Sequence, residues 1–478
     1  MGDSTSDRLS DRNPPESKLN LSTKLAFGAG DMGTAITAMI GISYSSMFLT
    51  DVAGLSPSLA GSTQSLGKIW DAVNDPLVGV LSDKNHPQNK WGRRYPWMIW
   101  GAVPFGFFFF IQWIVPQNFS QAGLFCYYTA ASILFNTFYT VVNLPYTTLT
   151  AELTRDYDER TRLNGFRYVF SIAGSVLAIA ITLTITAMFR EDRVLQALTI
   201  GAVCATISIL PIYWCVWGTR KRSQYMKSRN PETEASISLP FLQQLRITLT
   251  NIPFLYVIGI YLCSGLSFQL TAGIVPYFIV SWMRLPQLHV SLVFLAIQGT
   301  AMVMLFVWSY ISRRIGKKAV YMMGTIAWLI AQIGLYFLQP GEVGFLYGLC
   351  VIAGIGVSTA YLIPASMLPD VIELDELRTG QRREGVFYSF AVFIQKISLG
   401  FAIDIMLKSL GWAGYIKPTK DILVPIQPDS VLQVIRFFIS PLPAIALFIG
   451  LILTYFYPIT REAHQEILLE LEKQKNHK

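Results

Sequence analysis

The chain of 478 residues is 52% hydrophobic and only 14% charged, and it carries a formal net charge of +8. Soluble domains usually contain about 25% charged residues, so this composition excludes an ordinary soluble protein and predicts one that lies in a membrane. The positive charge does not indicate a nucleic-acid partner, because the basic residues follow every second apolar stretch instead of forming one patch.

The first 22 residues are polar, carry charges of both signs and contain no apolar core. They are predicted to form a disordered cytoplasmic tail rather than a signal peptide. Beyond them, hydropathy predicts about twelve apolar helices long enough to cross ~30 Å of hydrocarbon. Their approximate ranges are 25–50, 58–81, 96–115, 122–149, 166–189, 195–217, 254–282, 291–311, 319–338, 343–368, 385–407 and 431–457.

Lysine and arginine gather in the loops after the second, fourth, sixth, eighth and tenth predicted helices, whereas the opposite loops are nearly bare. Loops rich in these residues face the cytoplasm. Both termini are therefore predicted to be cytoplasmic, in a multi-pass protein of the plasma membrane.

The longest polar connection follows the sixth predicted helix and divides the chain into halves. The predicted units are an N-terminal lobe at 23–217, a cytoplasmic linker at 218–250, a C-terminal lobe at 251–457 and a cytoplasmic tail at 458–478. The stretch LPYTTLTAELTRDYDERTRLNG in the first half parallels IPASMLPDVIELDELRTGQRREG in the second. Because parallel repeats of six helices build the two lobes of major-facilitator transporters, we predict an all-α membrane protein with that fold.

Three charged residues, Lys68, Asp71 and Asp75, lie inside the second predicted helix, and both carboxylates share one face because they are four residues apart. A charge at mid-bilayer costs about 2.5–3.5 kcal/mol, so three unpaired charges would cost roughly 8–10 kcal/mol. They need one another, a bound cation or charges on neighbouring helices. Two interpretations stay open: a site for Na⁺ or a proton, and a structural cluster of ion pairs.

Polar residues also lie in the middle of the fourth predicted helix, namely Tyr139, Thr140 and Asn143. Such side chains commonly form hydrogen bonds between membrane helices. A hydroxyl oxygen beside two carboxylates is also a suitable ligand for a hard cation such as Na⁺. Pro145 interrupts the helical hydrogen bonds nearby, which favours a stretch that lines a cavity.

Two further charges lie within predicted helices. Lys396, in the eleventh, is expected to pair with Asp71 or Asp75 across the lobes, to recognise an anion, or both, because Na⁺ can displace a lysine from carboxylates. Arg167, at the start of the fifth, either extends to the membrane surface or contacts a polar group of the substrate.

The cytoplasmic loops of both halves contain clusters of acidic and basic residues. These are either solvated charges that set the topology or the two sides of a latch that closes when the lobes meet at the cytoplasmic side. The latch would join Asp83, Arg93 and Arg94 to Glu152, Asp156 or to Asp370, Glu373.

The sequence GAGDMG at 28–33 matches the dinucleotide-binding fingerprint, but that fingerprint needs a preceding strand and here it begins an apolar helix. Its glycines are expected to let helices pack closely. The five cysteines lack metal-ligand spacing, and the four histidines lie in loops or the tail. No enzyme, cofactor or structural metal is predicted.

Several segments, among them KIWDAVNDPLVGVLSD, WGRRYPW, LPYTTLTAEL, MLPDVIE and YSFAVFIQK, resemble the glycoside–pentoside–hexuronide:cation symporters. This major-facilitator family includes sodium:galactoside symporters of the melibiose permease type, and the resemblance covers essentially every predicted helix. It implies that Asp71, Asp75 and Thr140 bind the coupling cation, with Asn74 beside them.

The resemblance also places the family's helix-eleven lysine on Lys396 and its helix-five arginine on Arg167. With Asn143, Tyr139 and Lys68 they are expected to act in substrate binding and coupling.

The chain departs from the sugar-transporting pattern at the substrate. The galactoside-binding aspartates of helices one and four fall on Ala35 and Asn143, and a helix-four tryptophan falls on Thr147. The loss of two carboxylates that accept hydrogen bonds from sugar hydroxyls disfavours a galactoside. The stretches SMLPDVIELDE and SLGWAGY are also similar to the lysolipid-transporting branch of the family.

These features predict a monomeric, cation-coupled symporter that works by alternating access in the bilayer, with Na⁺ favoured over H⁺. A glycoside or other sugar is the first expected substrate, and a lysophospholipid or similar amphiphile is the alternative. A protein that binds or scrambles lipid without coupling is the third.

Overall fold

The structure is a computed structural model, and it describes residues 19–83, 91, 94–154, 157–189, 192–229, 249–379, 384–419, 422 and 424–476. Within these ranges the regular structure is helical, without β-strands, so the all-α prediction is confirmed. The predicted tail residues 1–18, the linker residues 230–248, Arg93 and Asp156 lie outside the described residues.

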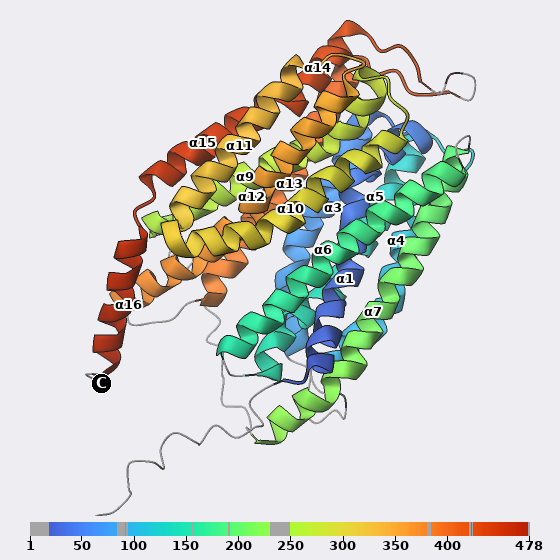
Figure 1. Cartoon of the computed structure of the whole chain (residues 1–478). Helices are drawn as coiled ribbons and strands as arrows, with labels where there is room; N and C mark the ends of the chain where they lie inside the picture. The colour runs from blue at the N-terminus through green and yellow to red at the C-terminus, as the bar shows by residue number, and fades with distance from the viewer. Residues whose placement is uncertain are drawn as a thin grey trace, which may run out of the picture.

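The helices form two bundles side by side, one from each half of the chain (Figure 1). The first bundle contains α1 (Leu21–Ser43), α2 (Ser45–Met47), η1 (Phe48–Val52), α3 (Pro57–Asp83), α4 (Tyr95–Ile111), α5 (Gln121–Leu153), α6 (Tyr157–Met188) and α7 (Arg193–Arg229). The second contains α9 (Ile252–Tyr277), η2 (Phe278–Trp282), α10 (Leu288–Ile315), α11 (Lys317–Phe337), α12 (Val343–Thr379), α13 (Glu384–Trp412), α14 (Asp429–Ile439) and α15 (Pro441–Phe456). We call these two bundles the N lobe and the C lobe.

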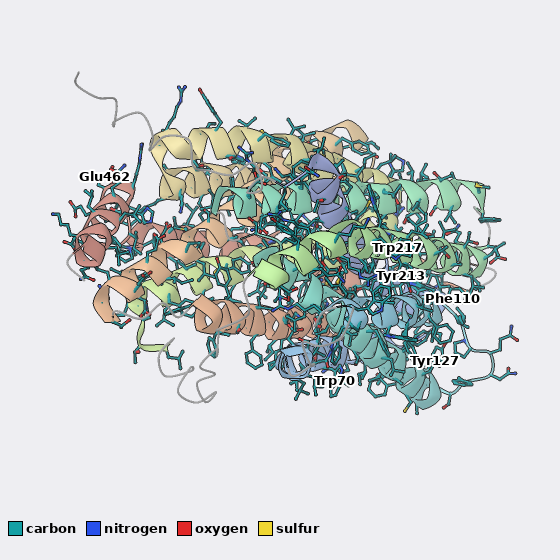
Figure 2. All side chains as sticks on the ribbon, turned by 90° about the horizontal axis from the view of Figure 1, so that it is seen from below. Trp70, Phe110, Tyr127, Tyr213, Trp217 and Glu462 are labelled. Atoms are coloured by element: carbon teal, nitrogen blue, oxygen red, sulfur yellow. The ribbon has the colours of Figure 1, made fainter. Side chains whose placement is uncertain are left out.

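Nine spans among the described helices are long and apolar enough to cross a membrane, and α4 is a shorter apolar helix. Neither α3 nor α5 is among the nine, because both contain the polar residues of the predicted site. The count of twelve crossings therefore stays a prediction. Large aromatic side chains are exposed, as on α7, where Trp217 is two-thirds exposed and stacks on Tyr213, with ring centroids 5.7 Å apart (Figure 2). Such exposed aromatic surface suits a lipid environment.

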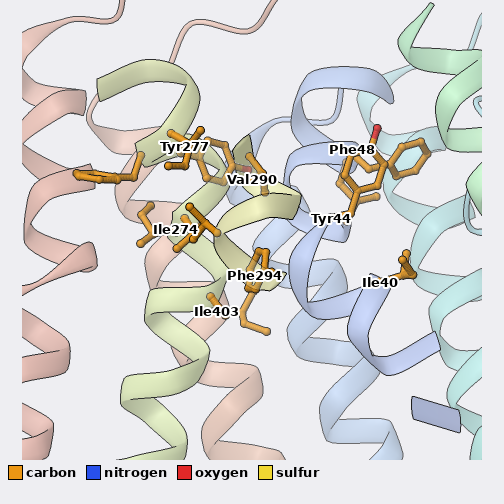
Figure 3. Packing of buried hydrophobic residues seen from close by; sticks show 14 of the residues in the cluster. Ile40, Tyr44, Phe48, Ile274, Tyr277, Val290, Phe294 and Ile403 are labelled. Atoms are coloured by element: carbon orange, nitrogen blue, oxygen red, sulfur yellow. The ribbon is translucent and has the colours of Figure 1, made fainter. Parts of the chain in front are cut away.

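The start of α1, the end of α7 and the C-terminal segment lie toward the same end of the molecule (Figure 1). We call this end, which carries the basic loops, the inner end, and the opposite end the outer end. One buried apolar cluster joins both lobes in the outer half, and it contains Tyr44 and Phe48 of the N lobe with Tyr277 and Phe294 of the C lobe (Figure 3). In the inner half each lobe has its own cluster. The lobes are thus packed together at the outer end.

The predicted tail at 458–478 contains a further helix, α16 (Arg461–Asn476). Its Ile467 and Leu471 are buried against the C lobe. His464 Nε2 lies 2.6 Å from Glu373 Oε2 and 3.4 Å from Asp370 Oδ1. An apolar face and an ion pair therefore hold α16 against the inner end of α12.

The docking of α16 is expected to weaken as pH rises. The hydrogen bond to Glu373 raises the pKa of His464, and the charge of Asp370 adds to this although burial opposes it. Because this pKa is raised on docking, protonated His464 stabilises the docked helix below pH ~6.5 and loses this effect as the pH rises through the shifted value. Hydrogen exchange of the α16 amides, corrected for intrinsic rates, should accelerate between pH 6 and pH 9 in the parent. In His464→Gln it should not respond to pH, and a parent-like response in this variant would exclude His464 as the cause.

Candidate cation and substrate site

The predicted cation residues meet between α3 and α5 of the N lobe and α13 of the C lobe. Asp71, Asn74 and Thr140 are buried, whereas Asp75 is partly exposed. The four-residue spacing on α3 places both carboxylates on the face that looks toward α13. The site therefore lies at the boundary of the lobes.

Lys396 of α13 bridges the two carboxylates. Its Nζ lies 3.0 Å from Asp71 Oδ1 and 2.6 Å from Asp75 Oδ2. Its side chain is about one-fifth exposed. An ion pair this sheltered is screened little by salt, and removing one partner would leave an uncompensated charge. The lobes are thus joined by an ion pair between one ammonium and two carboxylates, and a bound cation would add a second positive charge to this group.

Thr140 of α5 completes the group of oxygen atoms. Its Oγ1 lies 3.1 Å from Asp71 Oδ1 and 3.0 Å from Asp75 Oδ1. A hydroxyl has one proton, so it can donate to only one of these carboxylates at a time. Three oxygens from three side chains, two of them charged, form a donor set that suits a hard monovalent cation.

Neighbouring polar residues hold α3 against α5. Trp70 Nε1 donates to Thr137 Oγ1 at 2.8 Å, and Asn74 Nδ2 lies 3.5 Å from the carbonyl oxygen of Thr137. The amide nitrogen of Asn74 is thus directed at the α5 backbone, which positions Asp71 and Asp75 next to Thr140.

Lys68 lies apart from the carboxylates, although it is only three residues before Asp71. Among the described residues it forms no ion pair, and it lies where α3 packs closely against α13. A Cβ atom added at Gly400 would lie 3.0 Å from Cβ of Lys68, so glycine is what allows this approach. Asp404 of α13 pairs with Lys408 at 2.7 Å and accepts a hydrogen bond from Ser62 at 3.2 Å.

A second polar group belongs to the N lobe alone. Arg167 Nε of α6 lies 3.4 Å from Asp31 Oδ1 of α1, and its guanidinium stands 5.7 Å from the centre of the Tyr146 ring. Within the described part of the chain, neither Arg167 Nε nor the buried Oδ1 of Asn143 has a hydrogen-bond partner. Buried polar atoms without partners are uncommon, so Asn143 Oδ1 is available to a hydrogen-bond donor of a ligand, whereas Arg167 already faces the Asp31 carboxylate.

Tyr139 and Ala35 are the remaining positions that the sequence comparison with the sugar-transporting pattern brought up. Tyr139 packs its ring against Phe105 and Phe135, with centroid distances of 6.2 and 6.0 Å. Ala35 is buried on α1 and offers no polar atom beyond its backbone. No acidic side chain therefore stands where the sugar-transporting pattern has its helix-one aspartate.

The candidate latch residues pair within their own lobes in this structure. Arg94 Nε lies 2.9 Å from Glu152 Oε1, and Lys317 Nζ lies 2.7 Å from Asp370 Oδ1. Asp83 ends α3. A latch between lobes that are closed at the inner end stays a prediction.

One group among the described residues has the donors for a metal ion: Asp370, Glu373 and His464 place ligand atoms within 4.8 Å of one another. Lys317 Nζ lies 2.7 and 2.8 Å from the two oxygens of Asp370. This ammonium already supplies the positive charge, so the group is an ion-pair network.

Sequence reasoning did not identify the polar contacts that join the lobes at the outer end. Thr50 Oγ1 lies 2.9 Å from the Tyr277 hydroxyl, and the Tyr415 hydroxyl donates to Asp51 Oδ1 at 2.9 Å. The residues that make these contacts are single polar residues near helix ends, where polar residues are common. Only the position of Asp51 directly after an apolar stretch could have drawn attention to it.

Comparisons with known proteins agree with this architecture. Residues 26–461 match a family model described as MFS/sugar transport protein. An uncharacterised symporter from Synechocystis sp. is 42% identical, with 96% of this chain and 98% of that protein covered. A sodium-dependent lysophosphatidylcholine symporter from Xenopus tropicalis is 27% identical, with 94% of this chain and 89% of that protein covered.

Among solved structures, the nucleoside transporter NupG has a TM-score of 0.61 at 13% identity, over 92% of this chain and 100% of that one, which shows a shared fold. The predictions of a major-facilitator fold and of a protein that is not an enzyme are confirmed by these matches. The chain therefore belongs to the MFS/sugar transport protein family of multi-pass membrane transporters.

Proposed function

We propose that this protein is a symporter that couples transport of its substrate to Na⁺ by alternating access, as a monomer in the plasma membrane. The observation that carries the proposal is the bridge from Lys396 of the C lobe to Asp71 and Asp75 of the N lobe. Without Na⁺, the ammonium compensates both carboxylates. When Na⁺ binds Asp71, Asp75 and Thr140, it replaces that charge and releases α13 from α3. Occupancy of the site then biases how the lobes pack.

One Na⁺ per cycle supplies enough energy for such a symporter. At about −100 mV and a tenfold sodium gradient, one ion provides roughly 3.7 kcal/mol, which supports about 500-fold accumulation of a neutral solute. A protein that binds or scrambles lipid without coupling would have no need of buried carboxylates at the lobe boundary, which cost several kcal/mol. The coupled function is therefore favoured over the uncoupled one.

The test of coupling is sodium-22 uptake into liposomes that contain the purified protein. Uptake of the isotope should rise when substrate is added outside, and uptake of labelled substrate should rise with external sodium. Substrate flux that proceeds equally well in choline chloride would exclude sodium coupling, and an acid-dependent flux would point to H⁺ instead.

We propose that the protein is a member of the glycoside–pentoside–hexuronide:cation symporter family. As its substrate we propose an amphiphile with a phosphate-bearing head group, such as a lysophospholipid. The guanidinium of Arg167, whose Nε has no hydrogen-bond partner and lies 3.4 Å from Asp31 Oδ1, can donate to a phosphate oxygen, and Ala35 offers no acceptor to a sugar hydroxyl. The sodium-dependent lysophosphatidylcholine symporter among the relatives supports the same class. A sugar is the second candidate, supported by the family model's description as sugar transport.

A double substitution separates the two substrate classes. The parent is expected to take up labelled lysophosphatidylcholine with sodium and to show little or no binding of galactosides. Ala35→Asp together with Asn143→Asp supplies acceptors on α1 and α5 and should create sodium-dependent galactoside binding. Two new charges cost several kcal/mol unless water reaches them, so the variant's melting temperature is measured alongside.

The parent protein alone can refute the lysolipid proposal. Tight, sodium-dependent galactoside binding by the unmodified chain would assign it to the sugar transporters. Each single aspartate variant serves as a matched control, since one acceptor alone should restore less galactoside binding than two.

A further inference from the structure

Polar contacts close the outer end of the molecule. They join η1 and the turn after it, both in the N lobe, to the C lobe. Thr50 Oγ1 meets the hydroxyl of Tyr277 at 2.9 Å, Tyr415 donates to Asp51 Oδ1 at 2.9 Å, and Lys417 Nζ donates to the carbonyl oxygen of Gly54 at 2.6 Å. We call these contacts the outer seal. Each joins one lobe to the other, so all three must break before the outer end can open.

An apolar cluster adjoins the outer seal through Tyr277, whose hydroxyl contacts Thr50. The cluster includes Tyr44 and Phe48 of the N lobe together with Tyr277, Val290 and Phe294 of the C lobe (Figure 3). Phe48 also packs against Trp113, with ring centroids 4.9 Å apart. Thr50 and Tyr277 of the outer seal are fully buried, whereas Asp51, Tyr415 and Lys417 are partly exposed.

Asp51 is the carboxylate at the centre of the outer seal. Its Oδ1 accepts hydrogen bonds from both Thr50 Oγ1, at 2.8 Å, and Tyr415. The charged groups around it are Arg193 of α7 and Lys417 of the loop after α13, and the tyrosines that face it are Tyr44, Tyr277 and Tyr415. These tyrosines are neutral near pH 7, so Asp51 is the group of this set that changes charge in mildly acidic solution.

We propose that Asp51 makes the outer seal proton-sensitive, so that acid on the outer side holds the lobes closed there and slows the return to the outward-open state. The proposal rests on alternating access as proposed above, but it concerns residues that are separate from the cation and substrate sites.

The direction of the effect follows from the environment of Asp51 in the two states. In the closed seal, burial raises the pKa of Asp51 from 3.8 to about 6, against the opposing effects of the hydrogen bonds from Thr50 and Tyr415 and the charges of Arg193 and Lys417. When the seal opens, water solvates the carboxylate and its pKa returns toward the ordinary value. The closed state then binds a proton more tightly, so acid favours it. Between pH 7.5 and pH 5 the ratio of closed to open molecules should rise about tenfold.

The experiment measures the opening of the outer end directly. Spin labels are placed at Phe119→Cys and Gln339→Cys, which lie on outer loops of the N lobe and the C lobe, in a chain whose Cys126 and Cys263 are replaced by alanine. The distance between the labels is measured by pulsed electron spin resonance in lipid nanodiscs from pH 7.5 to pH 5. The short-distance population is expected to grow on acidification, with the ratio changing about tenfold.

Three variants decide whether Asp51 causes this effect. Asp51→Asn should give a distance distribution that does not change over this pH range. Asp404→Asn, which alters a carboxylate between the same lobes but outside the seal, should respond as the parent does. Tyr415→Phe removes a donor that stabilises ionised Asp51, so the midpoint of the response should move to higher pH. This third variant keeps the test decisive if Asp51→Asn folds poorly.

Two results would overturn the proposal: a parent distribution that is unchanged between pH 7.5 and pH 5, or an equal response in Asp51→Asn and the parent. The measurement needs no substrate. A pH-dependent seal without sodium-coupled uptake would therefore refute the proposed function alone, and sodium-coupled uptake with a pH-independent seal would refute this inference alone.

Discussion

Asp71→Asn and Asp75→Asn are each expected to abolish sodium-dependent accumulation of substrate. The amide keeps the size of the side chain but removes a formal charge from a set of three oxygens, and Lys396 then faces a single carboxylate. The cation then loses one of the two formal negative charges that bind it, and we expect a loss of sodium affinity of about 100-fold or more, which corresponds to about 2.8 kcal/mol. Initial uptake rates over a range of sodium concentrations, in liposomes with equal amounts of protein, measure the effect.

The matched control for these variants is Asp404→Asn. Asp404 lies on α13 between the same lobes, but it pairs with Lys408 and accepts from Ser62 rather than facing Thr140. Its substitution should leave the sodium dependence unchanged. If both Asp71→Asn and Asp75→Asn kept the parent's sodium activation, the assignment of the cation site would be wrong.

Lys396→Ala is expected to give a transporter whose activity depends weakly on sodium and more strongly on protons. Without the ammonium, two carboxylates that share Thr140 lie close together and uncompensated, so that a proton can replace the lysine on one of them. The closed packing of α3 against α13 also loses its ion pair. Uptake as a function of sodium, repeated at several pH values, distinguishes this outcome from simple loss of activity.

Two other lysines provide the comparison for Lys396. Lys408→Ala removes a partly exposed charge that pairs with Asp404 on the same helix, and it should keep the parent's sodium dependence. Lys68→Ala tests the one intramembrane lysine of α3, which lies against Gly400 and pairs with neither carboxylate in the described structure. A sodium response in Lys396→Ala that equals the parent's at every pH would assign Lys396 a peripheral role.

Local sequence patterns were enough to predict the helical membrane fold and the position of the candidate site. Composition excluded a soluble protein, and hydropathy placed the apolar helices, because burial in lipid imposes its requirements on each stretch separately. The spacing of Asp71 and Asp75 placed both carboxylates on one face of α3, since helical periodicity is a local property. The high cost of charges at mid-bilayer also required that they have partners.

The sequence offered Lys396 as a partner for Asp71 or Asp75, but only the tertiary structure places its ammonium against both, across 321 positions in the case of Asp75. The contact of Tyr415 with Asp51, across 364 positions, was not predicted from the sequence at all. The docking of α16 through His464 likewise depends on how a polar segment meets the end of α12. Sequence patterns indicate which side chains of each helix must be buried and which charges must be neutralised, but many different residue pairs could meet these requirements. The packing of one lobe against the other selects among them, because only that packing fixes distances between residues hundreds of positions apart.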